Sequence, residues 1–148
     1  MTNLKHLYRQ LLDSVHLEYE ANIQENQTCC TLLNENNDIV VEIEMTENSD
    51  LLLLHRKMAS LPSDPDLRTA RMLQVLALNA CPDKLCGSWF CIDSEGINIH
   101  LMAGYPIRLI APTEFNNLMY NFISLATTLE KELNEEMMEI KYSTGILV

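Results

Sequence analysis

The stretch IVVEIEMT, residues 39–46, decides the fold, because apolar and acidic side chains alternate along it. In a β-strand every second residue points to the same face. The alternate apolar residues from Ile39 to Met45 would therefore share one face, with Glu42, Glu44 and Thr46 on the other. This pattern predicts a strand with one buried and one solvated face, as is usual in antiparallel sheets.

Two more strands are predicted beside this one. Residues 28–33 favour a strand, and the turn-forming residues 34–38 would join it to the strand at 39–46. A second turn at 47–50 leads into residues 51–60, which begin with four consecutive leucines. These leucines would place apolar groups on both faces of a strand, so at least one face must be covered.

A helix is predicted after the third strand. Asp64 is suited to its N-cap and Pro65 to its first position. Residues 72–80 are apolar nearly all round, and Pro82 ends the helix. A helix without a polar face is buried on more than one side. In so short a chain, the second side is most simply covered by another copy of the same chain, which predicts a homodimer.

The remaining elements surround this centre. Residues 88–93 and 97–102 predict two strands joined by a turn in which Gly96 can take a positive φ. Helices are predicted at 4–15 and at 115–133, where Thr113 would be the cap, and the polar residues 18–27 are expected to form a loop. Acidic residues at the end of the last helix oppose its dipole by roughly 0.3–1 kcal/mol each. We therefore expect fraying near Met138 and a loose tail at 141–148.

The predicted fold class is α+β, with an antiparallel twisted sheet and the element order α-β-β-β-α-β-β-α. The sequence contains no internal repeat, low-complexity run or linker. Residues 1–148 are therefore expected to form one domain.

Composition narrows the function. The chain is 47% hydrophobic and 21% charged, which is normal for a folded domain, and its net charge is −11. That charge argues against nucleic acid and anionic membranes as partners and favours basic ones. The sequence shows neither a membrane-spanning run nor a signal-peptide pattern, and the odd number of cysteines indicates reduced thiols in a cytosol. The eight methionines favour either an adaptable binding surface or core filling.

No motif indicates catalysis or a bound metal. Cys81, Cys86 and Cys91 are separated by four residues each, whereas structural zinc sites use closer pairs and four ligands. Buried thiols are therefore the favoured interpretation. Cys29 and Cys30 would point to opposite faces of a strand. The four histidines are scattered, and no glycine-rich phosphate loop is present. We expect no enzyme activity, cofactor or metal.

The ordered pattern resembles the class I type III secretion chaperones, the Tir-chaperone-like family of small acidic bacterial proteins. The resemblance covers about residues 1 to 140. It rests on the helix at 4–15, the strand at 39–45, the helix ending in LALN at 76–79, the strand pair GSWFCID at 87–93 and INIHL at 97–101, and the helix at 115–133. The leucine–asparagine helix ending and the hairpin after it are its most specific parts.

This resemblance implies a homodimer in the cytoplasm of a Gram-negative bacterium. Such a chaperone binds the N-terminal chaperone-binding segment of one or more effector proteins and keeps it extended, stable and secretion-competent. The energy for release comes from the secretion ATPase, which is a further partner to consider. Neither nucleic acid nor a membrane is an implied partner.

The resemblance also implies roles for particular residues. Leu73, Leu76 and Ala77 of the middle helix would join the two protomers, with Trp89 nearby, although a core position is an equal alternative for Trp89. Effector contacts would come from the first helix and the sheet. The candidates are four apolar residues without an obvious internal partner, for which core packing is the alternative: Leu32, Val40, Leu52 and Leu54.

Two other functions stay open. A non-secretory adaptor or regulatory protein of the same fold would also use apolar grooves on an acidic body. A small thiol- or metal-dependent enzyme built on Cys81, Cys86 and Cys91 is the less favoured alternative.

Overall fold

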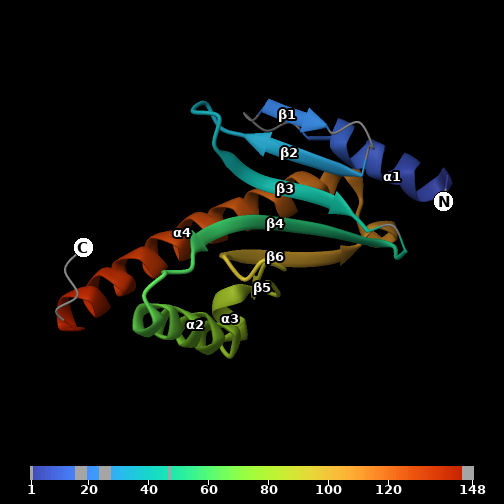
Figure 1. Ribbon diagram of the computed structural model, residues 1–148. Helices are drawn as coiled ribbons and strands as arrows, with labels where there is room; N and C mark the ends of the chain where they lie inside the picture. Colours follow the sequence, from blue (N-terminus) through green and yellow to red (C-terminus); the bar gives the residue numbers. More distant parts are fainter. Residues whose placement is uncertain (1, 16–19, 24–27, 47, 145–148) are drawn as a thin grey trace. The chain divides into compact units, whose positions relative to one another are not determined.

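The computed structural model describes residues 2–15, 20–23, 28–46 and 48–144 (Figure 1). Its helices are α1 (Thr2–Asp13), α2 (Pro65–Asn79), α3 (Pro82–Leu85), the 3-10 helix η1 (Ile107–Leu109) and α4 (Pro112–Thr144). Its strands are β1 (Glu20–Ile23), β2 (Cys29–Leu33), β3 (Ile39–Met45), β4 (Leu51–Ser60), β5 (Trp89–Ile92) and β6 (Asn98–Pro106).

These elements group into two compact units, each built from two separate stretches of chain. Unit 1 comprises Met1–Arg56 and Met102–Ser124, and unit 2 comprises Lys57–Leu101 and Leu125–Val148. Within unit 1 the strand order is β1-β2-β3-β4-β6, and within unit 2 it is β4-β6-β5. β4, β6 and α4 contribute residues to both units. The expectation of one domain over residues 1–148 stays a prediction.

The strand predicted at 39–46 is confirmed as β3, which pairs antiparallel with β2 and with β4. Val41, Ile43 and Met45 are buried as the alternation predicts. Ile39 is exposed because it begins the strand, where the register shifts next to Leu33. The sheet of unit 1 therefore has the buried face that the sequence indicated.

Within unit 1, α1 packs on the sheet through Tyr8, which is 1% exposed. Its hydroxyl donates a hydrogen bond of 2.8 Å to the carbonyl oxygen of Ile43 in β3. Burial is the main cause that raises the pKa of the Tyr8 phenol, so this group stays a donor. This hydrogen bond joins α1 to β3 through two residues that are 35 positions apart in the chain.

β1 corrects a prediction, because residues 20–23 lie within the segment that we expected to form a loop. Its four residues pair antiparallel with residues 30–33 of β2. Polar and apolar residues do alternate over residues 20–23, but only across four residues inside a polar segment. The strand forms because β2 offers it a row of backbone partners, and this makes β1 an edge strand of unit 1.

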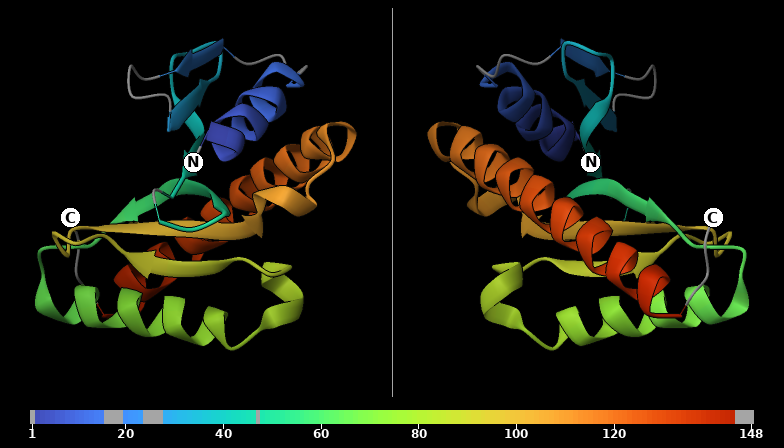
Figure 2. Two further views of the ribbon diagram at one scale, coloured as in Figure 1. Left: turned by 90° about the vertical axis from the view of Figure 1, so that its right-hand side faces the viewer. Right: turned by 90° about the vertical axis from the view of Figure 1, so that its left-hand side faces the viewer.

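α2 of unit 2 begins as predicted. The Asp64 carboxylate caps it by accepting hydrogen bonds from the backbone N–H groups of Asp66 and Leu67. One face of the helix is buried through Leu67, Arg71 and Val75. α2 runs beside β5, as the two views of Figure 2 show.

Arg71 is the buried cation of unit 2, with 5% of its surface exposed. Its Nη1 donates to the carbonyl oxygen of Leu133 in α4 at 2.7 Å and to Oε1 of Gln74 at 3.0 Å. Gln74 in turn donates to the Glu136 carboxylate. Desolvation lowers the pKa of Arg71, and the charge of Glu136 opposes that shift. Arg71 therefore fastens α2 to the C-terminal half of α4.

The β5–β6 hairpin has the predicted turn, and Gly96 takes a φ of +69°. The Asp93 carboxylate accepts hydrogen bonds from the backbone N–H groups of Ile97 and Asn98 and from the Asn98 side chain. The bond from Ile97 is the main cause that lowers the pKa of Asp93. Arg68 of α2 donates to the Gly96 carbonyl, which ties the turn to the helix.

Two predictions about α4 are wrong. Thr113 is not its cap, because the helix begins at Pro112 and the Ala111 carbonyl accepts from Glu114 and Phe115. The helix also continues through Thr144 instead of fraying near Met138. Burying an apolar side chain contributes roughly 1.5–3 kcal/mol, and Met137 is buried. That burial stabilises this part of the helix, and the glutamates up to Glu139 precede the last turn of a helix that ends at Thr144, so the dipole acts on them less strongly. Residues 145–148 of the predicted tail lie outside the described residues.

The fold class is therefore α+β with an antiparallel sheet, and the main elements follow the predicted order. β1, α3 and η1 are additions to that order. None of the described helices combines the length and the apolar character that a bilayer-spanning helix needs.

Candidate functional site

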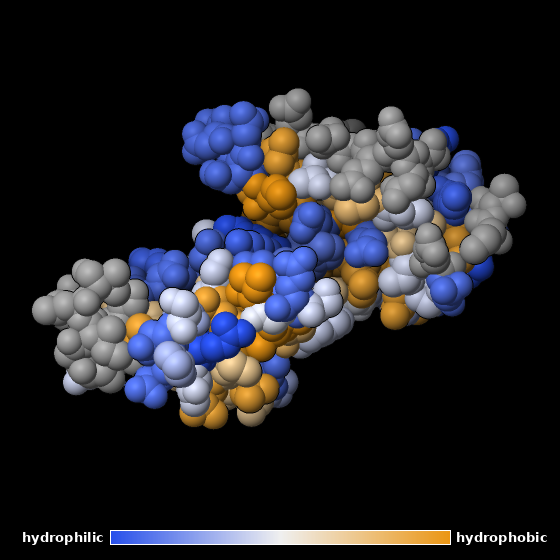
Figure 3. Space-filling model, viewed as in Figure 1, coloured by the Kyte–Doolittle hydropathy of each residue, from blue (hydrophilic) through white to orange (hydrophobic). Residues whose placement is uncertain are grey.

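The most prominent apolar surface of unit 2 lies on α2 and β5. Leu73 and Leu76 are each 61% exposed, Trp89 is 39% exposed, and Ala77 is also exposed. We call these four residues the α2–β5 patch. Figure 3 shows apolar residues gathered in the region of α2. All four residues selected from the sequence are thus at the surface, and the core position considered for Trp89 does not apply.

The patch exists because α2 has two apolar faces. Residues 73, 76, 77 and 80 follow helical spacing on one side, whereas Leu67, Arg71 and Val75 follow it on the buried side. Two leucines exposed to this extent on one short helix form a patch of the kind that marks protein interaction sites.

Asn79, at the end of α2, closes the edge of β5. β5 is the last strand in the sheet order, so its outer backbone groups have no strand partner. The Asn79 side chain accepts from the Phe90 N–H at 2.7 Å and donates to the Phe90 carbonyl oxygen at 3.0 Å. In an antiparallel strand these two groups point to the same side. Asn79 therefore occupies the place of a neighbouring strand on a strand of only four residues.

Asn79→Ala is expected to speed hydrogen exchange at the Phe90 amide by about tenfold or more and to lower the free energy of unfolding by about 1–3 kcal/mol. Asn79→Asp keeps the acceptor but loses the donor, so it should retain more protection of that amide than alanine does. Asn48→Ala, at an exposed turn residue, is the control. Exchange measured by NMR checks this, and an unchanged Phe90 rate in the alanine variant would show that Asn79 does not close the edge.

The four residues selected for effector contact lie in the interior. Leu32, Leu52 and Leu54 have no exposed surface, and Val40 is 7% exposed. The premise that they lack an internal partner is wrong for the leucines, because Leu32, Leu52 and Leu54 pair with Val41, Met45 and Ile43 on the one buried face of the sheet. A side chain with no exposed surface offers no contact to a peptide in this conformation.

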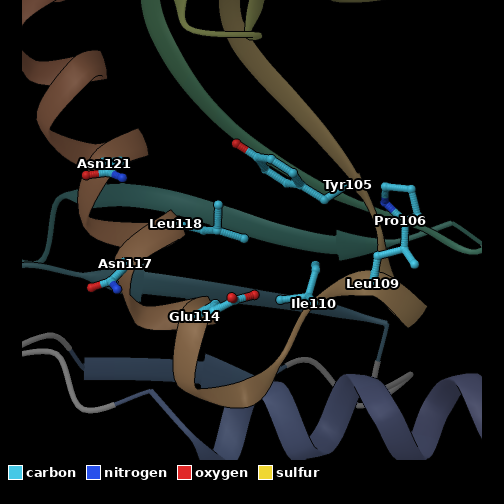
Figure 4. A pocket seen from close by; sticks show the side chains of 8 residues that line it. All are labelled: Tyr105, Pro106, Leu109, Ile110, Glu114, Asn117, Leu118 and Asn121. Carbon is cyan, nitrogen blue, oxygen red and sulfur yellow. The ribbon is translucent and has the colours of Figure 1, made fainter.

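Unit 1 contains a pocket where β6, η1 and α4 meet, and sequence reasoning did not find it. Its volume is about 350 Å³. We call it the α4 pocket; Figure 4 shows its lining side chains, which come from the end of β6, from and just after η1, and from the start of α4. They are Tyr105, Pro106, Leu109, Ile110, Glu114, Asn117, Leu118 and Asn121.

The polar face of β3 and β4 holds a small cluster of titratable groups. His55 Nδ1 lies 3.2 Å from Glu42, and its Nε2 lies 3.6 Å from Glu44. Cys29 pairs with Glu44 across β2 and β3, and burial together with these carboxylates raises the pKa of its thiol. Across the described residues, no three histidine, cysteine or acidic side chains converge in a way that could hold a metal ion.

Among the three cysteines of the alternative enzyme hypothesis, Cys91 lacks the lowered pKa of an activated nucleophile. Cys81 and Cys86 are exposed, and Cys91 is half-buried in β5. Burial and the neighbouring Asp93 raise the pKa of the Cys91 thiol, whereas a reactive cysteine has a lowered pKa.

Alkylation of the native protein is expected to modify Cys86 well before Cys30. Cys86 is exposed, whereas Cys30 is buried, and desolvation raises its pKa to about 11. Only the thiolate reacts, so Cys30 should react mainly after unfolding. Mass spectrometry of the alkylated peptides gives the order, with urea-unfolded protein as the control. Equal rates in the native protein would contradict the burial of Cys30.

Comparisons with known proteins agree with this geometry. A model of the Tir chaperone protein (CesT) family matches residues 6–130. No curated protein matches the sequence. Two solved structures share the fold. "Structure of the HopA1-SchA Chaperone-Effector Complex" has a TM-score of 0.63 and 14% identity, over 88% of this chain and 97% of that one. "Crystal Structure of the ExsC-ExsE Complex" has a TM-score of 0.55 and 13% identity, over 89% and 94%.

Proposed function

The chain belongs to the Tir chaperone protein (CesT) family, and from this membership we infer that it is a type III secretion chaperone that binds effector proteins. The family match over residues 6–130 is the observation that carries the inference. The titles of the two similar structures describe a chaperone–effector complex and the ExsC–ExsE complex, which supports it. On this proposal the chain acts in the cytoplasm of a Gram-negative bacterium.

The proposed action is binding without catalysis. The chaperone holds the N-terminal segment of an effector extended and competent for secretion, and the secretion ATPase supplies the energy for release. A disordered segment that folds on binding can bury roughly 1,000–3,000 Å², which offsets the cost of ordering it. The raised pKa of Cys91 favours binding over thiol chemistry at that residue.

The chaperone is proposed to act as a homodimer joined through the α2–β5 patch. Two copies meeting at this surface would cover Leu73, Leu76, Ala77 and Trp89, which a monomer leaves in water. An interface between identical chains is usually twofold symmetric, so the same patch serves both partners. Because Asn79 occupies the outer groups of Phe90, the two copies would meet through side chains and not through a continuous sheet.

The effector segment is proposed to add as a strand at β1. Strand addition supplies backbone hydrogen bonds, and grooves for alternate side chains supply selectivity. β1 borders only β2, whereas Asn79 blocks the opposite edge at β5. For the buried Leu32, Val40, Leu52 and Leu54 we propose a different role from effector contact, namely packing beneath the strands that receive the segment.

Co-expression with N-terminal segments of secreted proteins from the same genome tests the function. The expected result is a complex that survives purification and that contains two copies of this chain by light scattering. The same effectors truncated to remove their N-terminal segments serve as the control. Failure of every candidate segment to stay bound would overturn the chaperone proposal, and a segment-independent complex would point to an adaptor instead.

A further inference from the structure

We propose that the α4 pocket is a specificity site that receives an apolar side chain of the effector segment next to a basic residue. This rests on the proposed chaperone function. The pocket lies wholly within unit 1. Its volume of about 350 Å³ is at the lower end of the range of roughly 300–1,000 Å³ in which ligand pockets are found. It therefore has room for a side chain and part of the adjoining backbone.

The apolar wall of the pocket presents Leu109 to solvent in a fixed position. Leu109 is 78% exposed although it is a large apolar residue. η1, which contains Leu109, is anchored at its start: Ile107 is buried, and its N–H donates to the Asp50 carbonyl at 2.7 Å. Arg108 also lies 3.9 Å from the Asp50 carboxylate. The anchored 3-10 helix therefore keeps the Leu109 side chain exposed. An apolar side chain of a partner would cover Leu109 and remove it from water.

The opposite wall carries polar groups that the described protein leaves available. Glu114, Asn117 and Asn121 lie along one side of α4 with Leu118, and their side chains surround the pocket in Figure 4. Within the part of the chain that the structure describes, none of these three polar side chains makes a hydrogen bond or ion pair, whereas neighbouring Asn116 donates to the Ser14 carbonyl at 2.7 Å. Two amides can bond to the backbone of an extended peptide, and the carboxylate can pair with a cation.

Charge favours a basic peptide as the occupant. Glu114 is the charged residue of the pocket lining, so an acidic segment would meet like-charge repulsion there. A lysine or arginine beside the apolar anchor would instead meet Glu114. The apolar wall supplies affinity, and the charged rim supplies selectivity between partners.

A short peptide tests the pocket without a known effector. The probe is acetyl-Gly-Ser-Leu-Lys-Ser-Gly-amide, titrated into the full chain labelled with ¹⁵N. Saturable shifts are expected at the amides of Leu118 and Asn121. Leu109→Asp should weaken binding by about tenfold, because it removes the apolar contact. Tyr120→Asp, at an exposed α4 residue outside the lining, should leave binding unchanged.

A charge exchange tests the selectivity. Glu114→Lys should lower the affinity for the lysine peptide by about two- to fivefold, as expected for an exposed ion pair. A peptide with glutamate in place of lysine should bind this variant with the lost affinity restored. Absence of saturable shifts at the pocket, or equal binding by Leu109→Asp, would overturn the proposal. Failure of the glutamate peptide to recover binding would overturn the role of Glu114.

An effector segment found by co-expression separates this proposal from the chaperone function. If the wild-type chain retains the segment and Leu109→Asp binds it about tenfold more weakly, the pocket is supported. If both proteins retain it equally, the pocket proposal is wrong and the chaperone function stands. If the wild-type chain retains no segment, the chaperone function fails, and the peptide titration alone decides whether the pocket binds.

Discussion

Leu76→Glu is expected to convert the proposed dimer into a monomer. In the proposed interface this residue lies on the exposed face of α2, where 61% of its surface is open. Each copy would bring one new carboxylate, so a twofold interface would bury two like charges against apolar side chains. An unpaired buried charge costs about 3 kcal/mol or more, which corresponds to a dissociation constant raised by about a hundredfold or more.

Light scattering and analytical ultracentrifugation measure this change. Leu109→Glu is the matched control, because it makes the same substitution at an exposed leucine of unit 1 and should leave the dimer intact. The Leu76 variant should keep the circular dichroism of the wild-type chain, since the residue is exposed. A Leu76→Glu protein that remains dimeric would place the interface elsewhere, and a monomeric wild-type protein would overturn the dimer.

Arg71→Ala is expected to lower the free energy of unfolding by about 2–4 kcal/mol. The substitution removes the charged donor that joins α2 to the Leu133 carbonyl of α4 and to Gln74. It also leaves a cavity where the long side chain was buried. Arg71→Met keeps most of the apolar stem, so we expect it to recover a substantial part of the loss.

Urea unfolding followed by circular dichroism measures both variants. Lys131→Ala is the control on α4, because its ion pair with Glu135 is exposed at 3.8 Å and should be worth less than about 1 kcal/mol. If Arg71→Ala destabilises the protein no more than Lys131→Ala does, then the Arg71 hydrogen bonds do not fasten the two helices.

Local sequence patterns predicted most helices and strands, because the formation of these elements depends mainly on residues that are close together in the sequence. The alternation at 39–46 gives β3, the Asp64–Pro65 start gives α2, and the glycine turn gives the β5–β6 hairpin. β1 was missed because its alternation covers only the four residues 20–23 of a polar segment, and pairing with β2 is what makes it a strand. The end of α4 was misjudged because the dipole argument omits the burial of Met137.

The candidate sites also include some that the sequence indicated and some that it did not. The apolar residues around α2 predicted a second apolar face, and Leu73, Leu76 and Ala77 are exposed there, whereas its coverage by a second copy stays a prediction. The effector candidates failed because an apolar run such as residues 51–54 does not reveal which side chains are covered. The α4 pocket could not be found, since Tyr105 and Asn121 are 16 positions apart and no motif joins them.

The sequence by itself determined which residues share a face: the stripes of α2, the alternate residues of β3 and the turn of the hairpin. Only the tertiary structure decided which of those faces is covered, which leaves Leu76 in water and Leu54 in the core. Only packing could also bring Asn79 against Phe90 and so close one edge of the sheet. The physical reason is that periodicity fixes the direction of a side chain from its own backbone, whereas burial depends on what the distant parts of the chain place against it.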